Sequence, residues 1–182
     1  MRILGISGSL RRDSYNTGLV RTAAALAPGD VEPWDGLKGI PPYDEDDEAS
    51  PATAVVELRS ALADADAVLF ATPEYNSSVP GHLKNALDWA SRPLAANPLR
   101  NKPVAVVGAA TGAFGAVWAQ AELRKVLAAI GARVLDDELA VGSAATRFDE
   151  TGLLADEELR ERLGEVVANL MVAVDERLAA AA

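Results

Sequence analysis

The stretch Ile3-Leu4-Gly5-Ile6-Ser7-Gly8-Ser9-Leu10-Arg11-Arg12-Asp13-Ser14-Tyr15-Asn16 decides the expected fold, because it runs from a strand through a loop into a helix. The apolar residues of 2–7 predict a buried strand, and the periodic apolar residues of 16–27 predict a helix. Free backbone N–H groups at the start of a helix, together with the helix dipole, favour a bound anion. We therefore predict a phosphate-binding loop over residues 8–16.

The side chains of this loop suit a phosphate group. Ser9, Ser14 and Asn16 offer neutral donors, and Arg11 or Arg12 offers a charged, forked donor. The loop has neither the Gly-Lys-Ser/Thr of a Walker loop nor Gly-x-Gly-x-x-Gly, which disfavours a nucleoside triphosphatase and the usual dinucleotide fold. The alternative is a polar connection in which Ser14 or Asn16 only caps the following helix.

The rest of the chain alternates between strand and helix patterns. Further strands are expected at 31–34, 67–72, 102–109 and 133–135, the last possibly continuing at 139–141, and further helices at 52–65, 80–91, 116–130 and 156–179. This alternation predicts a single α/β domain over residues 1–182, with a parallel sheet covered by helices on both faces. The loops 73–81 and 110–115 also follow strands, so we expect all three loops to open on one edge of the sheet.

Composition excludes several kinds of function. The formal net charge of −10 argues against nucleic-acid binding. The chain has no cysteine and only one histidine, which excludes a thiolate nucleophile, a cysteine-ligated cluster and a multi-histidine metal site. It shows no membrane-spanning run and no signal peptide, so we expect a cytoplasmic protein without a membrane partner. The acidic run 44–48 is interpreted as a solvated loop rather than a cation site.

Two of the loops carry motifs of a known family. Gly8-Ser9-Leu10-Arg11-x-x-Ser14-x-Asn16 and Pro73-Glu74-Tyr75-Asn76-Ser77-x-Val79-Pro80-Gly81-x-Leu83-Lys84-Asn85-Ala86-Leu87-Asp88-Trp89 resemble the NADPH-dependent FMN reductases. That family is flavodoxin-like and includes quinone, chromate and azo-dye reductases. The resemblance implies a flavodoxin-like five-stranded parallel sheet, bound FMN, and hydride transfer from NADPH or NADH through the flavin to a flavin, quinone or similar small acceptor. It also implies a homodimer or homotetramer.

The resemblance further implies that the flavin carries the chemistry, with no catalytic side chain and no metal. It places the loop 8–16 around the FMN phosphate, the loop after the third strand beside the isoalloxazine, and the loop after the fourth strand near the pyrimidine side of the ring. Within the second loop, we interpret Glu74 as a loop-forming carboxylate rather than a general acid, and Tyr75 as a flat wall for the ring. The candidate cofactor-binding residues are Ser9, Arg11, Ser14, Tyr15, Asn16, Pro73, Glu74, Tyr75, Asn76, Ser77, Thr111 and Gly112.

Several alternatives stay open from the sequence. A flavodoxin-type electron carrier without its own turnover is the main one, and Arg11 in the phosphate loop argues against it. Trp89 and Trp118 lie off the apolar stripes of their helices, which indicates a partner surface, unless loops of the same chain cover them. We interpret His82 as structural or interfacial rather than as a proton donor, and Arg12 as a candidate contact for the 2′-phosphate of NADPH.

Overall fold

The structure is a computed structural model that describes residues 1–181, and its centre is one parallel sheet. Five strands lie in the order β2-β1-β3-β4-β5, which is the flavodoxin-like order. The strands are β1 (Ile3–Ser7), β2 (Val31–Trp34), β3 (Ala67–Thr72), β4 (Pro103–Ala109) and β5 (Arg133–Val141). The helices are α1 (Tyr15–Leu26), α2 (Thr53–Asp64), α3 (Gly81–Ala90), α4 (Val117–Ala129) and α5 (Glu157–Ala181). The predicted α/β alternation is therefore confirmed.

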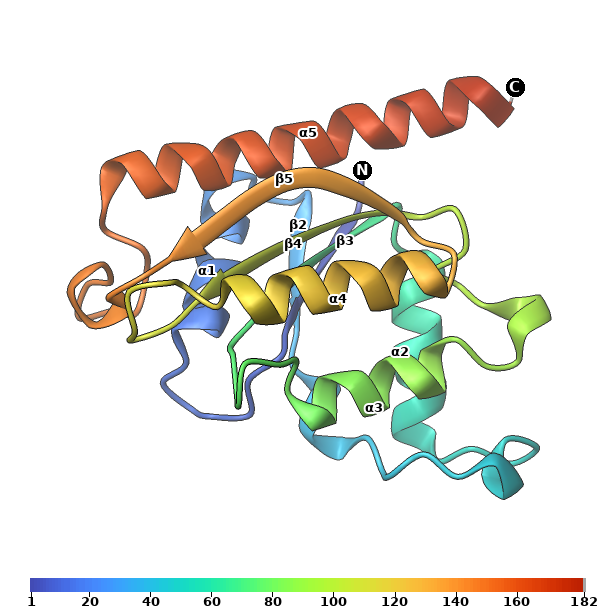
Figure 1. Ribbon diagram of the computed structural model, residues 1–182. Coiled ribbons are helices and arrows are strands. Elements are labelled where there is room, and N and C mark those ends of the chain that lie inside the picture. The colour runs from blue at the N-terminus through green and yellow to red at the C-terminus, as the bar shows by residue number, and fades with distance from the viewer. Residues whose placement is uncertain (182) are drawn as a thin grey trace.

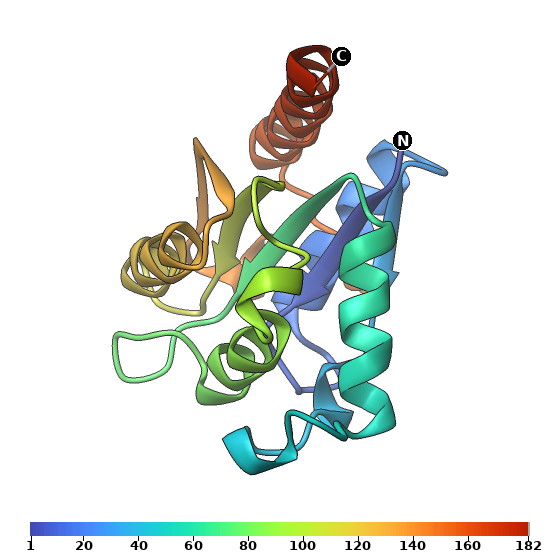
Figure 2. The ribbon, with the colours of Figure 1, turned by 90° about the vertical axis from the view of Figure 1, so that its right-hand side faces the viewer.

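The helices cover both faces of the sheet (Figures 1 and 2). Side chains that alternate along a strand point to opposite faces, so each central strand supplies both cores. Val68 and Phe70 of β3 pack in the core shared with α2, α3 and α4, whereas Leu69 and Ala71 pack in the core shared with α1 and α5. Within residues 1–181, no helix combines the length and the apolar character that a membrane span requires.

β5 is one continuous strand rather than two short ones. Its pairing with β4 is irregular between the two apolar segments, 133–135 and 139–141, that the sequence pattern predicted as strand. Val104 of β4 pairs with Val134 of β5, but Val106 pairs with Glu138, so β5 bulges away from its neighbour. The guanidinium of Arg124, from α4, donates hydrogen bonds to the carbonyls of Leu135, Asp137 and Val106. This arginine satisfies carbonyl groups at the irregularity, and it thereby holds β5 to α4.

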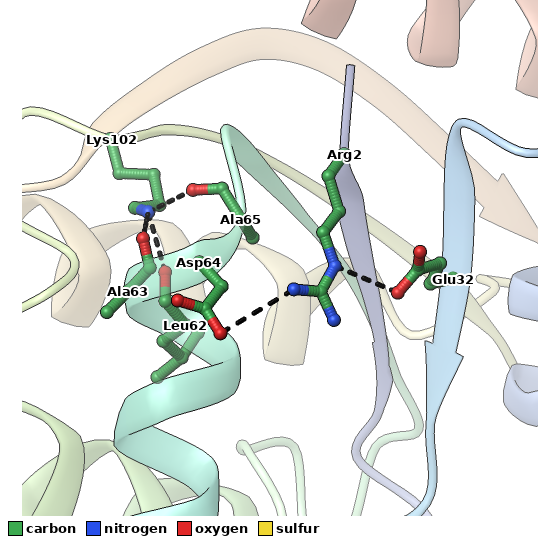
Figure 3. A network of polar contacts seen from close by, with 7 residues as sticks. All are labelled: Arg2, Glu32, Leu62, Ala63, Asp64, Ala65 and Lys102. Atoms are coloured by element: carbon green, nitrogen blue, oxygen red, sulfur yellow. Dashed lines mark hydrogen bonds and ion pairs between the residues drawn. The ribbon is translucent and has the colours of Figure 1, made fainter.

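At the amino end of the sheet, a buried lysine binds backbone carbonyls at the end of α2 (Figure 3). The ammonium group of Lys102 donates to the carbonyl of Leu62 at 2.6 Å, to that of Ala63 at 3.4 Å, and to that of Ala65. These carbonyls end α2, so Lys102 acts as a C-terminal cap from another element. Its burial lowers the pKa of Lys102 to about 8. The network lies far from the loops at the carboxyl ends of the strands.

The prediction that Trp89 faces a partner is wrong. Trp89 is 1% exposed, and its indole N–H donates to the carbonyl of Pro41 at 2.9 Å. The neighbouring side chains on the same flank of α3 contact the same loop: Asn85 donates to Pro41 at 2.8 Å, and His82 Nε2 lies 2.8 Å from the carbonyl of Leu37. This flank therefore binds the chain's own loop after β2, and His82 has a structural role.

The acidic run 44–48 is an ordered part of that loop. Asp44 accepts a hydrogen bond from the backbone of Asp46 at 3.0 Å and caps a short 3-10 turn. Glu48 accepts from the hydroxyl of Tyr43 at 2.5 Å and pairs with Arg92 at 3.5 Å. The hydrogen bond to Glu48 raises the pKa of Tyr43. The run is thus ordered by one hydrogen bond within it and by the contacts of Glu48 with Tyr43 and Arg92.

Candidate functional site

The three predicted loops meet at the carboxyl edge of the sheet (left in Figure 1) and enclose a hollow of about 330 Å³. This volume lies within the range of small-molecule sites, which is about 300–1,000 Å³. We call it the edge hollow. Its lining residues are Ser9, Arg11, Ser14, Tyr15, Asn16, Pro73, Glu74, Tyr75, Ala109, Ala110 and Thr111. The sequence analysis missed Ala109 and Ala110, although their place at the end of a buried strand was a signal for them.

Three candidate residues do not line the edge hollow. Asn76 and Ser77 have positive φ angles of 54° and 58°, and they form the tip of a tight turn whose ends, Tyr75 and Ser78, exchange two backbone hydrogen bonds of 3.1 Å. Two positive φ values in a two-residue turn are typical of type I′. Gly112 lies further along its loop, where its carbonyl accepts from the backbone of Ser143 at 2.9 Å. Asn76 and Ser77 therefore shape the loop that presents Tyr75.

Serine hydroxyls shape the loop between β1 and α1. The hydroxyl of Ser14 accepts a hydrogen bond from the backbone N–H of Asn16 at 3.2 Å and caps α1. Similarly, Ser7 accepts from the backbone of Ser9, and Ser9 accepts from the backbone of Arg11, both at 3.3 Å. The capping interpretation of Ser14 is confirmed. It is compatible with an anion site, because a cap satisfies only one of the free N–H groups at a helix start.

Asn16 has a partner that the sequence analysis did not foresee. Its carboxamide donates to the carbonyl of Ala109 at 3.0 Å and accepts from the N–H of Ala109 at 2.9 Å. The pairing of β3 with β4 stops at Thr72 and Gly108, because the next residue of the chain, Pro73, has no N–H. Asn16 is 3% exposed and takes the place of a strand beyond that point. Its side chain thus serves the scaffold, in contrast to the expected phosphate contact.

Arg11 lines the edge hollow and is exposed. Its guanidinium carbon lies 5.3 Å from the centre of the Tyr15 ring, a cation–π arrangement. Tyr15 in turn packs against Phe148 with ring centres 5.1 Å apart. Among residues 1–181, no carboxylate lies within 4.0 Å of the Arg11 guanidinium. The charge of Arg11 is therefore available to an anionic ligand.

Glu74 joins the second loop to α4. One carboxylate oxygen accepts from the backbone N–H groups of Trp118 and Ala119, each at 3.1 Å. These groups belong to the first turn of α4, where helix N–H groups lack intrahelical acceptors. Glu74 thus caps α4 from the loop after β3. Its carboxylate ties that loop to the helix, which agrees with its interpretation as a loop-forming residue. Tyr75 beside it is 54% exposed and also lines the hollow.

The lining of the edge hollow has features that suit an organic anion. Within the part of the chain that the structure describes, no three histidine, cysteine, aspartate or glutamate side chains gather in a metal-binding cluster. Instead, the hollow combines an unpaired arginine, a helix start and an aromatic side chain. A phosphate group at one end and a planar ring at the other would match these features.

Comparison with known proteins shows the family to which the chain belongs. The profile of the NADPH-dependent FMN reductases matches residues 1–146. An NAD(P)H-dependent FMN reductase of Pseudomonas aeruginosa is 43% identical over 176 residues, covering 94% of each chain. A 2-hydroxy-1,4-benzoquinone reductase of a Burkholderia species is 38% identical over 165 residues, covering 90% of each chain.

The solved structure of FerB, a flavoenzyme NAD(P)H:(acceptor) oxidoreductase from Paracoccus denitrificans, superposes with a TM-score of 0.88 at 34% identity. The match covers 96% of this chain and 97% of FerB. These similarities are to reductases, so a flavodoxin-type carrier without turnover is not favoured. The chain belongs to the NADPH-dependent FMN reductase family and is an oxidoreductase that uses FMN and NAD(P)H.

Proposed function

We propose that the edge hollow is the FMN site of this reductase and that the protein reduces quinones or free flavins there. One observation carries the proposal: three strand-to-helix loops converge on a hollow of about 330 Å³ that has an unpaired arginine at one end. The redox chemistry there would be supplied by bound FMN, as the acceptor of hydride from NADPH or NADH and the donor of electrons to the quinone or flavin. The chain itself then needs to bind and orient the flavin and the substrates and to shield them from water, and it needs no nucleophilic side chain.

The lining residues divide this work between the two ends of the hollow. Arg11 and Ser9, with the N–H groups at the start of α1, would hold the phosphate. Tyr75 would form a wall for the ring, while backbone groups of Ala110 and Thr111 would meet its polar edge. Asn16 positions these two ends relative to each other, because it links α1 to the end of β4.

The proposal is tested by the flavin that the protein retains and the acceptors that it reduces. Acid precipitation of the purified protein should release FMN, identified by mass. NADPH or NADH oxidation should then depend on added benzoquinone or free FMN. Release of FAD, or no flavin after reconstitution with excess FMN, would refute the site, and an FMN protein inert with both nicotinamides would support the carrier alternative.

Arg11→Ala tests the phosphate end directly. Loss of a charge-assisted hydrogen bond of about 1.5–3 kcal/mol should weaken FMN binding by roughly 10- to 100-fold. Riboflavin lacks the phosphate, so its affinity should scarcely change. Equal losses for FMN and riboflavin would contradict the assignment of Arg11.

We further propose that two copies of the chain, or four, associate in the cytoplasm through an aromatic patch beside the edge hollow. Phe114 and Trp118 are 64% and 49% exposed and lie edge to face, with ring centres 5.0 Å apart. Aromatic side chains so exposed are typical of interfaces. Since NADPH and NADH are intracellular electron donors, the proposed reaction suits a cytoplasmic enzyme.

Trp118→Glu should dissociate this assembly, because it introduces a charge into a buried interface. Sedimentation velocity at micromolar concentration would show the change from oligomer to monomer. A wild-type chain that sediments as a monomer would refute the interface. Substitution of the buried Trp89 would disturb folding and is not a test of association.

A further inference from the structure

A second hollow of about 360 Å³ adjoins the edge hollow. It lies between the start of α1 and the loop 145–152 that precedes α5. Arg11, Ser14 and Tyr15 line both hollows, so the two hollows are immediate neighbours. The proposed FMN site does not use this space. We call it the side hollow.

Three arginines line the side hollow: Arg11, Arg12 and Arg21. Arg21 donates to the carbonyl of Thr151 at 3.1 Å, which holds its guanidinium against the loop 145–152. Throughout residues 1–181, no ion pair within 4.0 Å joins any of these three arginines to a carboxylate. In a chain with a formal net charge of −10, such a group marks a local site for an anion.

Carboxylates also line the side hollow, so its ligand should offer hydrogen-bond donors as well as negative charge. Asp149 accepts from the hydroxyl of Thr151 at 2.6 Å and from its backbone at 2.8 Å, and the hydroxyl contact does most to lower the pKa of Asp149. This carboxylate therefore organises the loop. Asp13 and Glu150 are exposed acceptors at the rim. A lining with both signs suits a ligand that carries hydroxyl groups as well as phosphate, such as a phosphorylated ribose.

An aromatic pair lines the side hollow. Tyr15 and Phe148 are partly buried, with ring centres 5.1 Å apart at an angle of 41°. Gly18 lets Phe148 and the carbonyl of Gly152 approach α1 closely, because a Cβ there would lie 2.9 Å from the Phe148 ring and 2.4 Å from that carbonyl. Aromatic rings beside cationic side chains favour a planar, phosphorylated group.

We propose that the side hollow holds the adenosine end of the nicotinamide dinucleotide, and that Arg12 and Arg21 bind the 2′-phosphate that distinguishes NADPH from NADH. The inference rests on the proposed FMN site, since the shared lining of Arg11, Ser14 and Tyr15 sets the side hollow next to that site. Arginine forks match phosphate geometry, and carboxylates match ribose hydroxyls.

Titration calorimetry on the FMN-loaded protein tests the inference without turnover. The probes are adenosine 2′,5′-bisphosphate, 5′-AMP and inorganic phosphate. Arg12→Ala and Arg21→Ala should each weaken the bisphosphate by roughly 10- to 100-fold, the usual effect of losing a charge-assisted contact, while 5′-AMP changes less than about threefold. The same variants should raise KM for NADPH much more than KM for NADH.

Arg100→Ala is the matched control, because it removes an equal charge from an exposed site before β4, at the other end of the sheet. The inference is overturned if wild-type protein binds the bisphosphate no more tightly than 5′-AMP, or if Arg100→Ala weakens it as much as the two variants do. Inorganic phosphate binding as tightly as the bisphosphate would also overturn it. FMN content separates the two failures, because a preparation that holds FMN and shows no discrimination refutes this inference alone.

Discussion

Replacing Asn16 with alanine should destabilise the protein and loosen its flavin site together. The substitution removes both hydrogen bonds between the carboxamide and the backbone of Ala109. Ala109 is 2% exposed, so its N–H and C=O would be left buried without these partners. An unsatisfied buried group costs about 1–3 kcal/mol, so the two groups together should cost about 2–6 kcal/mol of unfolding free energy. That is a large part of a typical total of about 5–15 kcal/mol.

Urea unfolding of the FMN-free protein measures this loss as a lower midpoint at unchanged slope. FMN and riboflavin should lose affinity by similar factors, because Asn16 positions the loops rather than the phosphate. Asn169→Ala is a control: that exposed amide contacts Asp137 at 2.7 Å, and its loss should change stability by less than about 0.5 kcal/mol. An Asn16→Ala protein of wild-type stability that loses affinity for FMN alone would refute this reasoning.

Three further predictions follow from the caps and the irregular strand. Lys102→Met should lower the unfolding free energy by about 2–4 kcal/mol, since three carbonyls that end α2 lose their donor, with kcat unchanged. The pKa of Lys102 is about 8 in the folded protein and ordinarily 10.5, so the folded state binds fewer protons than the unfolded state between these two pH values. Urea titrations should therefore show that wild type gains stability relative to Lys102→Met as the pH rises from about 8 to 10.5. Glu74→Ala should cost about 1 kcal/mol by uncapping α4, as thermal unfolding would show; an unchanged midpoint would contradict the cap. Arg124→Leu should speed amide exchange along residues 133–141, and equal exchange in both proteins would contradict its role at the irregularity.

Local sequence patterns were sufficient to predict the strands and helices and their order along the chain. A strand such as 67–72 is apolar throughout because both of its faces are buried, and a helix such as 156–179 shows an apolar stripe. Since parallel strands end at a common edge, the loops after β1, β3 and β4 could be expected to meet there, as they do. The family motifs lie in those same loops, which is why the flavin site could be proposed before the fold was known.

Trp89 and Trp118 show where helical periodicity stops being informative. Both lie off the apolar stripe of their helices, but the loop after β2 covers Trp89 through Pro41 and leaves Trp118 exposed. Periodicity describes the faces of one helix and carries no information about which distant loop will pack on them.

Contacts between distant residues were decided by the tertiary structure alone. Asn16 and Ala109 are 93 positions apart, and Arg21 and Thr151 are 130 apart. In sequence, Asn16 is equally suited to binding phosphate, capping a helix or pairing with a strand end. Its role was settled by the backbone groups that folding brought within hydrogen-bond distance, because a buried carboxamide must find partners wherever the chain places it.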